Sequence, residues 1–185
     1  MARVQPLLNY EEWLHMPIVE DGTDEVVKGE LRFIPPLLYP HAEVIARLIA
    51  QLDPPVDEKK VGLLGSNLGL MISRDPLTCR SPDLIMFWRD KMVIKDGLYY
   101  SPPELIVEIM SPSEGRRRKE QKMEDYGSIG VPEVWLCSPQ AQSIEVRRLS
   151  SSGRLERTAV VVDGTLEPAH FPGVKIAVPE IWPGE

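Results

Sequence analysis

Apolar and polar positions along the 185-residue chain change period several times, and each change marks a predicted element. From His41 to Leu52, apolar residues recur at spacings of three and four, which predicts an amphipathic helix. Residues 83–88 (DLIMFW) and 104–110 (ELIVEIM) are almost entirely apolar over the length of a strand, as is typical of strands covered on both faces. Residues 133–137 (EVWLC) predict another strand, and the polar stretch 114–129 favours a helix.

Shorter alternating segments predict hairpins and one further helix. Residues 25–34 predict a hairpin about Lys28-Gly29, residues 62–73 a hairpin near Ser66-Asn67, and residues 143–162 a hairpin about Ser152-Gly153. A short helix is expected over residues 9–16, with Asn9 as its N-cap. Many of the 18 prolines lie where these elements should end. The pattern therefore predicts one domain over residues 1–185, with a mixed sheet flanked by helices.

Composition and charge narrow the class of protein. The formal net charge is −7, which argues against a protein that coats nucleic acid without sequence preference. Two distant cysteines, Cys79 and Cys137, form no C-x-x-C motif, so neither a disulfide framework nor a cysteine-built zinc site is expected. No apolar run is long enough to span a membrane, and the first residues do not resemble a secretion signal. We therefore expect a cytoplasmic protein without a membrane partner.

Glu108 interrupts an apolar face of the predicted strand 104–110. Ile106, Glu108 and Met110 would point to one side of this strand, because successive side chains alternate. An ionised carboxylate in a covered sheet is costly unless a cation or several hydrogen-bond donors surround it. Glu108 is therefore either a site residue or a structural residue that pairs with an arginine or reaches water at the end of the strand.

Asp83 stands in a similar position, directly before the other apolar strand. An aspartate after a proline is commonly a turn residue, and that interpretation applies if Asp83 acts alone. Together with Glu108 on a neighbouring strand, it would supply the hard oxygen ligands that Mg²⁺ or Mn²⁺ prefers. The two carboxylates thus form a candidate metal site for phosphate chemistry.

Basic residues follow the Glu108 strand. Lys122 shares a predicted helix face with Tyr126 and could hold a water molecule or stabilise charge on a phosphate, or could simply face solvent. Cations in a first helical turn oppose the helix dipole, whereas a nucleic-acid backbone would attract them. Such cations are candidate DNA contacts: Arg116, Arg117 and Lys119. His41 and Glu25 each have a structural interpretation when taken alone. With only three histidines in the chain, the sequence argues against a three-histidine zinc centre.

The order of these motifs resembles the Uma-type family of restriction endonucleases, members of the PD-(D/E)XK nuclease superfamily. The resemblance covers nearly the whole chain, and the combination of motifs in this order is specific. The residues that carry it are Glu25, Gly29-Glu30, His41, Ser81-Pro82-Asp83, residues 104–113 (ELIVEIMSPS), Lys122, Tyr126 and residues 130–135 (GVPEVW).

The resemblance implies a restriction-endonuclease-like three-layer α/β/α core with a central mixed β-sheet, an extra N-terminal hairpin and C-terminal strands. It implies that Asp83, Glu108 and the main-chain carbonyl of Ile109 bind a divalent metal, Mg²⁺ or Mn²⁺. It selects Lys122 as the site lysine, because Met110 stands where the superfamily pattern places one. It also gives His41 and Glu25 as polar site residues.

The expected function is a metal-dependent endonuclease acting on DNA, and a homodimer is expected because cutting both strands needs two sites. One departure from the family pattern is Arg118, which stands where relatives usually carry an aspartate. Two alternatives stay open. The chain could be a catalytically degenerate nuclease-fold module that binds nucleic acid or a protein partner, or a hydrolase of another phosphoester.

Overall fold

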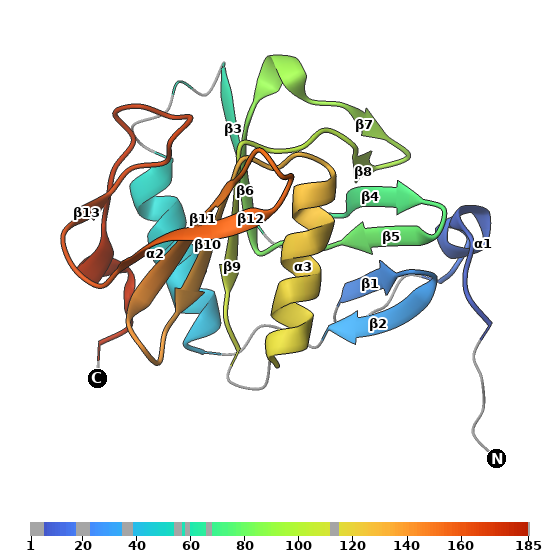
Figure 1. Ribbon diagram of the computed structural model, residues 1–185, viewed down its shortest axis with the longest axis horizontal. Coiled ribbons are helices and arrows are strands. Elements are labelled where there is room, and N and C mark those ends of the chain that lie inside the picture. Colours follow the sequence, from blue (N-terminus) through green and yellow to red (C-terminus); the bar gives the residue numbers. More distant parts are fainter. Residues whose placement is uncertain are drawn as a thin grey trace.

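A six-stranded mixed sheet has the strand order β12-β11-β10-β9-β6-β3 (Figure 1). Its strands span Val61–Gly65 (β3), Leu84–Trp88 (β6), Leu105–Ile109 (β9), Glu133–Ser138 (β10), Ser143–Leu149 (β11) and Leu155–Val161 (β12). Strands β9 and β10 are parallel, and the other neighbours in this sheet are antiparallel. The computed structural model describes residues 6–17, 23–34, 39–53, 57, 60–65, 68–111 and 115–184.

A second six-stranded sheet has the order β2-β1-β5-β4-β8-β7. Its strands span Thr23–Val27 (β1), Glu30–Ile34 (β2), Leu70–Arg74 (β4), Leu77–Arg80 (β5), Ile94–Lys95 (β7) and Leu98–Tyr99 (β8). A small sheet near the C-terminus pairs Thr165–Leu166 (β13) with Ile176–Ala177 (β14). Short 3₁₀ helices cover Arg89–Lys91 and Val178–Ile181.

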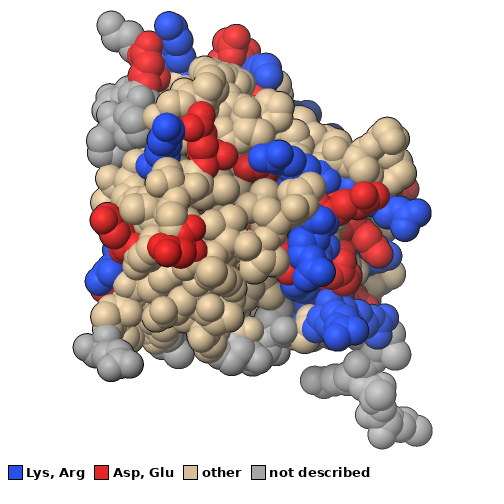
Figure 2. Space-filling model, turned by 60° about the vertical axis from the view of Figure 1, so that its left-hand side comes forward, with Lys and Arg blue, Asp and Glu red and all other residues tan. Residues whose placement is uncertain are grey.

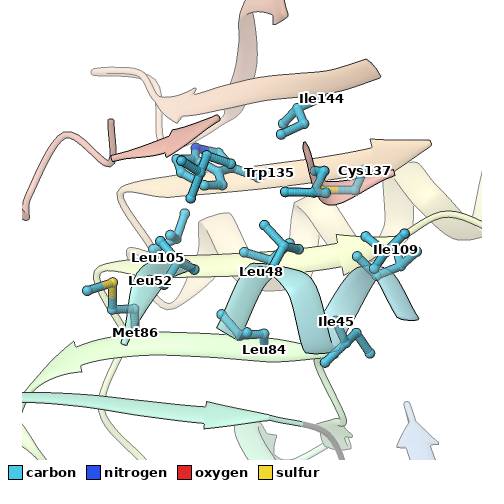
Figure 3. Packing of buried hydrophobic residues seen from close by; sticks show 14 of the residues in the cluster. Ile45, Leu48, Leu52, Leu84, Met86, Leu105, Ile109, Trp135, Cys137 and Ile144 are labelled. Atoms are coloured by element: carbon cyan, nitrogen blue, oxygen red, sulfur yellow. The ribbon is translucent and has the colours of Figure 1, made fainter. Parts of the chain in front are cut away.

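Helices α2 (His41–Leu52) and α3 (Arg116–Ser128) lie on opposite faces of the first sheet, which we call the central sheet. On the α2 face, Leu48 and Leu52 pack against side chains from four neighbouring strands (Figure 3). On the other face, α3 and the second sheet share one core with the central sheet. The result is the predicted α/β architecture of helix, mixed sheet and helix, with a second sheet added beside α3.

Side chains of β9 alternate between these two cores, as the sequence predicts. Leu105, Val107 and Ile109 pack on the α2 side, whereas Ile106 packs on the α3 side. All five residues of β9 are buried. Glu108 therefore points into the layer between the central sheet and α3.

Most predicted elements are confirmed, with small differences at their ends. The hairpin about Lys28-Gly29 forms with positive φ at both turn residues, the combination that a two-residue hairpin turn requires. The hairpin of β11 and β12 is confirmed as well. Helix α1 (Tyr10–Leu14) begins at the predicted N-cap Asn9, which forms a capping box with Glu12, but it ends earlier than expected.

The predicted hairpin over residues 62–73 is wrong. Strand β3 pairs with β6 in the central sheet, and β4 pairs with β5 and β8 in the second sheet. The proposed turn at residues 66–67 lies outside the described residues. Both strands have distant partners in space that a local alternation pattern does not reveal.

Gly62 allows β3 to pair closely with β6. A Cβ atom added at Gly62 would lie 2.2 Å from Cζ of Phe87, a ring that is buried in the α3-side core. Gly62→Ala is therefore expected to lower the free energy of unfolding by about 1–3 kcal/mol through overpacking. Urea denaturation measures this change. Gly184→Ala, at a position with open space, is the control and should change stability by less than about 0.5 kcal/mol.

Within the described part of the chain, no helix has the length and apolar character needed to cross a membrane.

Candidate active site

Glu108 is a buried carboxylate with two partners on helix α3. Its side chain is 3% exposed, and its Oε2 atom lies 2.7 Å from Nζ of Lys122. Its Oε1 atom accepts a hydrogen bond from the hydroxyl of Tyr126. Lys122 and Tyr126 are four residues apart on α3, so both side chains reach the same point of β9. The spacing read from the sequence thus corresponds to a real cluster of three polar groups.

Burial changes the protonation of this cluster. The pKa of Glu108 is raised to about 7, chiefly because burial disfavours the charged form; Lys122 opposes this effect and the nearby carboxylate of Asp83 adds to it. Burial also raises the pKa of Tyr126 well above its usual value, so this residue stays a hydrogen-bond donor at neutral pH. The site therefore holds a carboxyl group that changes charge near neutrality, beside a lysine.

Asp83 lies at the entrance to β6 and is tied to β9. The register pairs Leu84 with Val107, which brings Asp83 next to Glu108 across the two strands. The Oδ2 atom of Asp83 accepts a 2.7 Å hydrogen bond from the main-chain N–H of Ile109. Two carboxylates thus lie side by side at one end of the central sheet, as the sequence predicts.

His41 comes to the same place from the first turn of α2. Its Nε2 atom is 3.1 Å from Oδ1 of Asp83, and the two side chains are 22% and 13% exposed. The buried Nε2 atom is at ion-pair distance but is not aligned for a hydrogen bond. His41 therefore completes the described cluster on the side opposite Lys122.

Glu25 lies next to the cluster and is fully engaged by other groups. Its Oε2 atom is 2.9 Å from Nη1 of Arg80, and its Oε1 atom accepts a 3.2 Å hydrogen bond from the main-chain N–H of Ser81. Arg80 also donates to Asp125 of α3. Glu25 thus belongs to a buried ion-pair group that joins the second sheet to α3, and it contacts Ser81, which lies two residues before Asp83 in the sequence.

The basic residues at the start of α3 divide into two groups. Arg116, Arg117 and Arg118 are exposed. Lys119 instead lies 3.1 Å from Glu145 of β11 and is only 22% exposed. Figure 2 shows one face of the molecule, on which basic and acidic side chains gather together on the right-hand side rather than in separate patches. Binding of a polyanion to this face would therefore depend on a few local cations.

Sequence reasoning did not assign a site role to Tyr126, Arg80 or Asp125. Tyr126 carried a usable signal, because it follows Lys122 at the spacing of one helical turn. Arg80 ends a strand, and all four residues of that strand are buried. A charged residue in such a strand requires a partner, but the sequence does not reveal that the partners are Glu25 and Asp125.

The residues present fit a hard divalent cation. Among the described residues, no group of three or more His, Cys, Asp and Glu side chains could hold a metal. Mg²⁺, however, is commonly bound by one or two carboxylates together with water and substrate phosphate. Asp83 and Glu108 supply this pair, and the carboxylate of Asp83 disfavours the ionised form of Glu108. A cation between them would relieve this repulsion.

Comparisons with known proteins agree with this fold. A crystal structure titled as that of a "putative nuclease belonging to DUF820" from Anabaena variabilis superimposes with a TM-score of 0.78. The two chains share 16% sequence identity, and the match covers 95% of this chain and 97% of the other. No curated protein matches the chain. Residues 10–179 match the Uma2 family, described as "Putative restriction endonuclease". The chain therefore belongs to the Uma2 family.

Proposed function

We propose that this chain is a Mg²⁺- or Mn²⁺-dependent endonuclease that hydrolyses phosphodiester bonds of DNA. The observation that carries the proposal is the buried Glu108, which lies beside Asp83 and is held by Lys122 and Tyr126. Family membership supports a nuclease, and the paired carboxylates support a metal-assisted reaction. A purely structural ion pair would not require the second carboxylate.

Asp83 and Glu108 would hold the metal, together with the main-chain carbonyl of Ile109. A divalent ion bound there supplies charge stabilisation at the scissile phosphate and lowers the pKa of bound water. The N–H of Ile109 keeps Asp83 against β9, and Tyr126 orients the carboxylate of Glu108. Each interaction fixes a metal ligand before substrate binds, so less reorganisation is needed during the reaction.

Lys122 would position the attacking water or stabilise charge that develops on the phosphate. Its ammonium group lies 2.7 Å from Glu108 and only 16% of its side chain is exposed, which holds the charge within the cluster. His41 would assist from the other side through its contact with Asp83. Glu25 would assist indirectly, since both of its oxygens are engaged by Arg80 and Ser81.

DNA would approach along the exposed start of α3. Arg116 and Arg117 lie on the same helix as Lys122, and Arg116 is about 9 Å from it along the helix axis at 1.5 Å per residue. This distance exceeds the spacing between successive phosphates of one DNA strand. With Lys122 at the scissile phosphate, the two arginines would therefore contact phosphates next to it. Lys119 is a weaker candidate because Glu145 already neutralises it. A homodimer would provide two such sites for two strands.

Metal affinity is expected to rise with pH. A carboxylate must be ionised to bind a metal, and the pKa of Glu108 is about 7 before binding. Binding therefore releases about one proton at pH 6 and about none at pH 8, and the affinity should fall by about 25-fold from pH 7.5 to pH 5.5. Titration calorimetry with Mn²⁺ in buffers of different ionisation enthalpy measures both quantities.

Two outcomes of this titration would speak against the proposed site. An affinity that varies less than twofold over this pH range would mean that Glu108 does not bind the metal. No binding at all would favour the rival function, a degenerate nuclease-fold module that binds nucleic acid or a protein partner. The exposed Arg118, at the position where the family resemblance implies an aspartate, favours that rival. Parallel cleavage assays with DNA, RNA and small phosphodiesters test the third possibility, a hydrolase of another phosphoester.

A further inference from the structure

We infer that Arg80 is a positioning residue that aligns the two halves of the candidate active site. The inference rests on the proposed function for its effect on cleavage, whereas its structural part can be tested separately. The two halves come from different parts of the fold. Asp83 follows β5 on the connection to β6, whereas Lys122 and Tyr126 lie on α3.

Arg80 connects three elements through one buried guanidinium. Its side chain is 2% exposed. Its Nη1 atom lies 2.9 Å from Oε2 of Glu25 on β1, while its Nε and Nη2 atoms lie 2.8 and 2.6 Å from Oδ2 of Asp125 on α3. The planar fork of arginine suits such a contact with two carboxylates in fixed directions, which a lysine cannot reproduce.

One branch of this bridge fixes the segment that carries Asp83. With Oε2 held by Arg80, Glu25 accepts the N–H of Ser81 on Oε1, and the hydroxyl of Ser81 donates to the carbonyl of Asp24 at 3.4 Å. Asp83 follows Ser81 by two residues. Glu25 therefore fixes the direction of the chain between β5 and Asp83, and Arg80 fixes the position of the Glu25 carboxylate.

The other branch fixes α3. Only three of its thirteen residues are buried, Met123, Tyr126 and Gly127, so apolar packing defines its rotation and axial position poorly. Asp125 lies between Lys122 and Tyr126 along the helix. Its contact with Arg80 therefore holds the turn from which both partners of Glu108 project.

A second polar bridge on α3 provides a matched comparison. Arg147 of β11 donates to both oxygens of Glu120 at 2.9 Å, and its side chain is 11% exposed. This bridge also ties α3 to a sheet, but it contacts neither Glu108 nor the segment of Asp83 in any described interaction. If loosening α3 is what matters, breaking either bridge should have the same effect on cleavage. If Arg80 positions the site, breaking the Arg80 bridge should lower cleavage more than breaking the Arg147 bridge.

The test compares Arg80→Met with Arg147→Met in the full chain. Displacement of reacting groups by about 1 Å can reduce rates by about 10²-fold, so Arg80→Met should lower kcat for DNA cleavage by about that factor with KM changed less than about threefold. Arg147→Met should keep kcat within about threefold. Amide exchange of Ile109, whose N–H is held by Asp83, should accelerate at least about tenfold in Arg80→Met only.

Asp125→Ala is the milder variant and decides the question if Arg80→Met does not fold. It releases α3 while Arg80 still holds Glu25, so kcat should fall by about tenfold while exchange of Ile109 stays as in the native chain. Equal kcat and equal Ile109 exchange in the Arg80 and Arg147 variants would overturn the inference, as would native kcat in Asp125→Ala. If the native chain cuts no DNA, the proposed function fails, and the exchange of Ile109 alone confirms or overturns the positioning role.

Discussion

Glu108→Gln is expected to abolish metal-dependent DNA cleavage by this chain. Glutamine keeps the size of the side chain and can still accept the hydrogen bond from Tyr126, but it carries no charge to bind a metal or to pair with Lys122. Loss of about 4 kcal/mol of transition-state stabilisation corresponds to a rate at least about 10³-fold lower. Initial rates of plasmid nicking at saturating Mg²⁺ measure the loss.

A measurement of folding is needed to show that Glu108→Gln loses catalysis and not its folded structure. Breaking this buried ion pair leaves Lys122, whose side chain is only 16% exposed, without its charged partner, so the melting temperature should fall. Cleavage rates are therefore compared at a temperature at which the circular dichroism spectrum shows that the variant is folded. Glu104→Gln is the matched control, since Glu104 is also buried, lies at the opposite end of the same strand region and pairs with Lys91. It should cleave at the native rate. Retained cleavage by Glu108→Gln would contradict the site assignment.

Lys122→Met is expected to lower cleavage by about 10²–10³-fold at pH 7. One part of this loss is the missing cation near the phosphate, since a single positioned donor is commonly worth that factor. A second part comes from Glu108. Lys122 lowers the pKa of Glu108, so without it the carboxyl group stays protonated to higher pH and binds metal less well.

The pH dependence of Lys122→Met distinguishes these two parts. Because the pKa of Glu108 rises when the lysine is removed, the variant should regain part of its activity as the pH is raised from 7 to 9. Lys122→Arg keeps a positive charge and should retain more activity at pH 7 than the methionine variant. Lys175→Met, which removes an exposed lysine near the C-terminus, should cleave like the native chain. A loss that is the same at every pH would show that Lys122 does not act through Glu108.

Much of the fold follows from local patterns in the sequence. The apolar stripe of α2 and the nearly continuous apolar run of β9 predicted both elements, because helix and strand periods differ and each requires a buried face. The same alternation placed Glu108 on an apolar face with Ile106 and Met110 and identified it as an unusual residue. Lys28-Gly29 predicted its hairpin because positive φ is needed at both positions.

Long-range pairing could not be predicted in this way. The sequence pattern of β3 fits a local partner as well as a distant one, and the structure pairs β3 with β6, where Gly62 lies against Phe87. Candidate site residues were found where a charge interrupts an apolar pattern, as at Glu108. Arg80 was not marked in this way, because no strand was predicted over residues 77–80, and its partners lie 55 and 45 residues away. The bridge from Glu25 to Asp125 therefore became visible only in three dimensions.

Cleavage of supercoiled plasmid DNA tests the central claim most directly. The native chain is compared with Asp83→Ala and with Asp163→Ala, which removes an exposed carboxylate outside the site. We expect nicking by the native chain and by Asp163→Ala with Mg²⁺ or Mn²⁺, none with a chelator, and none by Asp83→Ala. No nicking by the native chain with either metal, or equal nicking by Asp83→Ala, would contradict it.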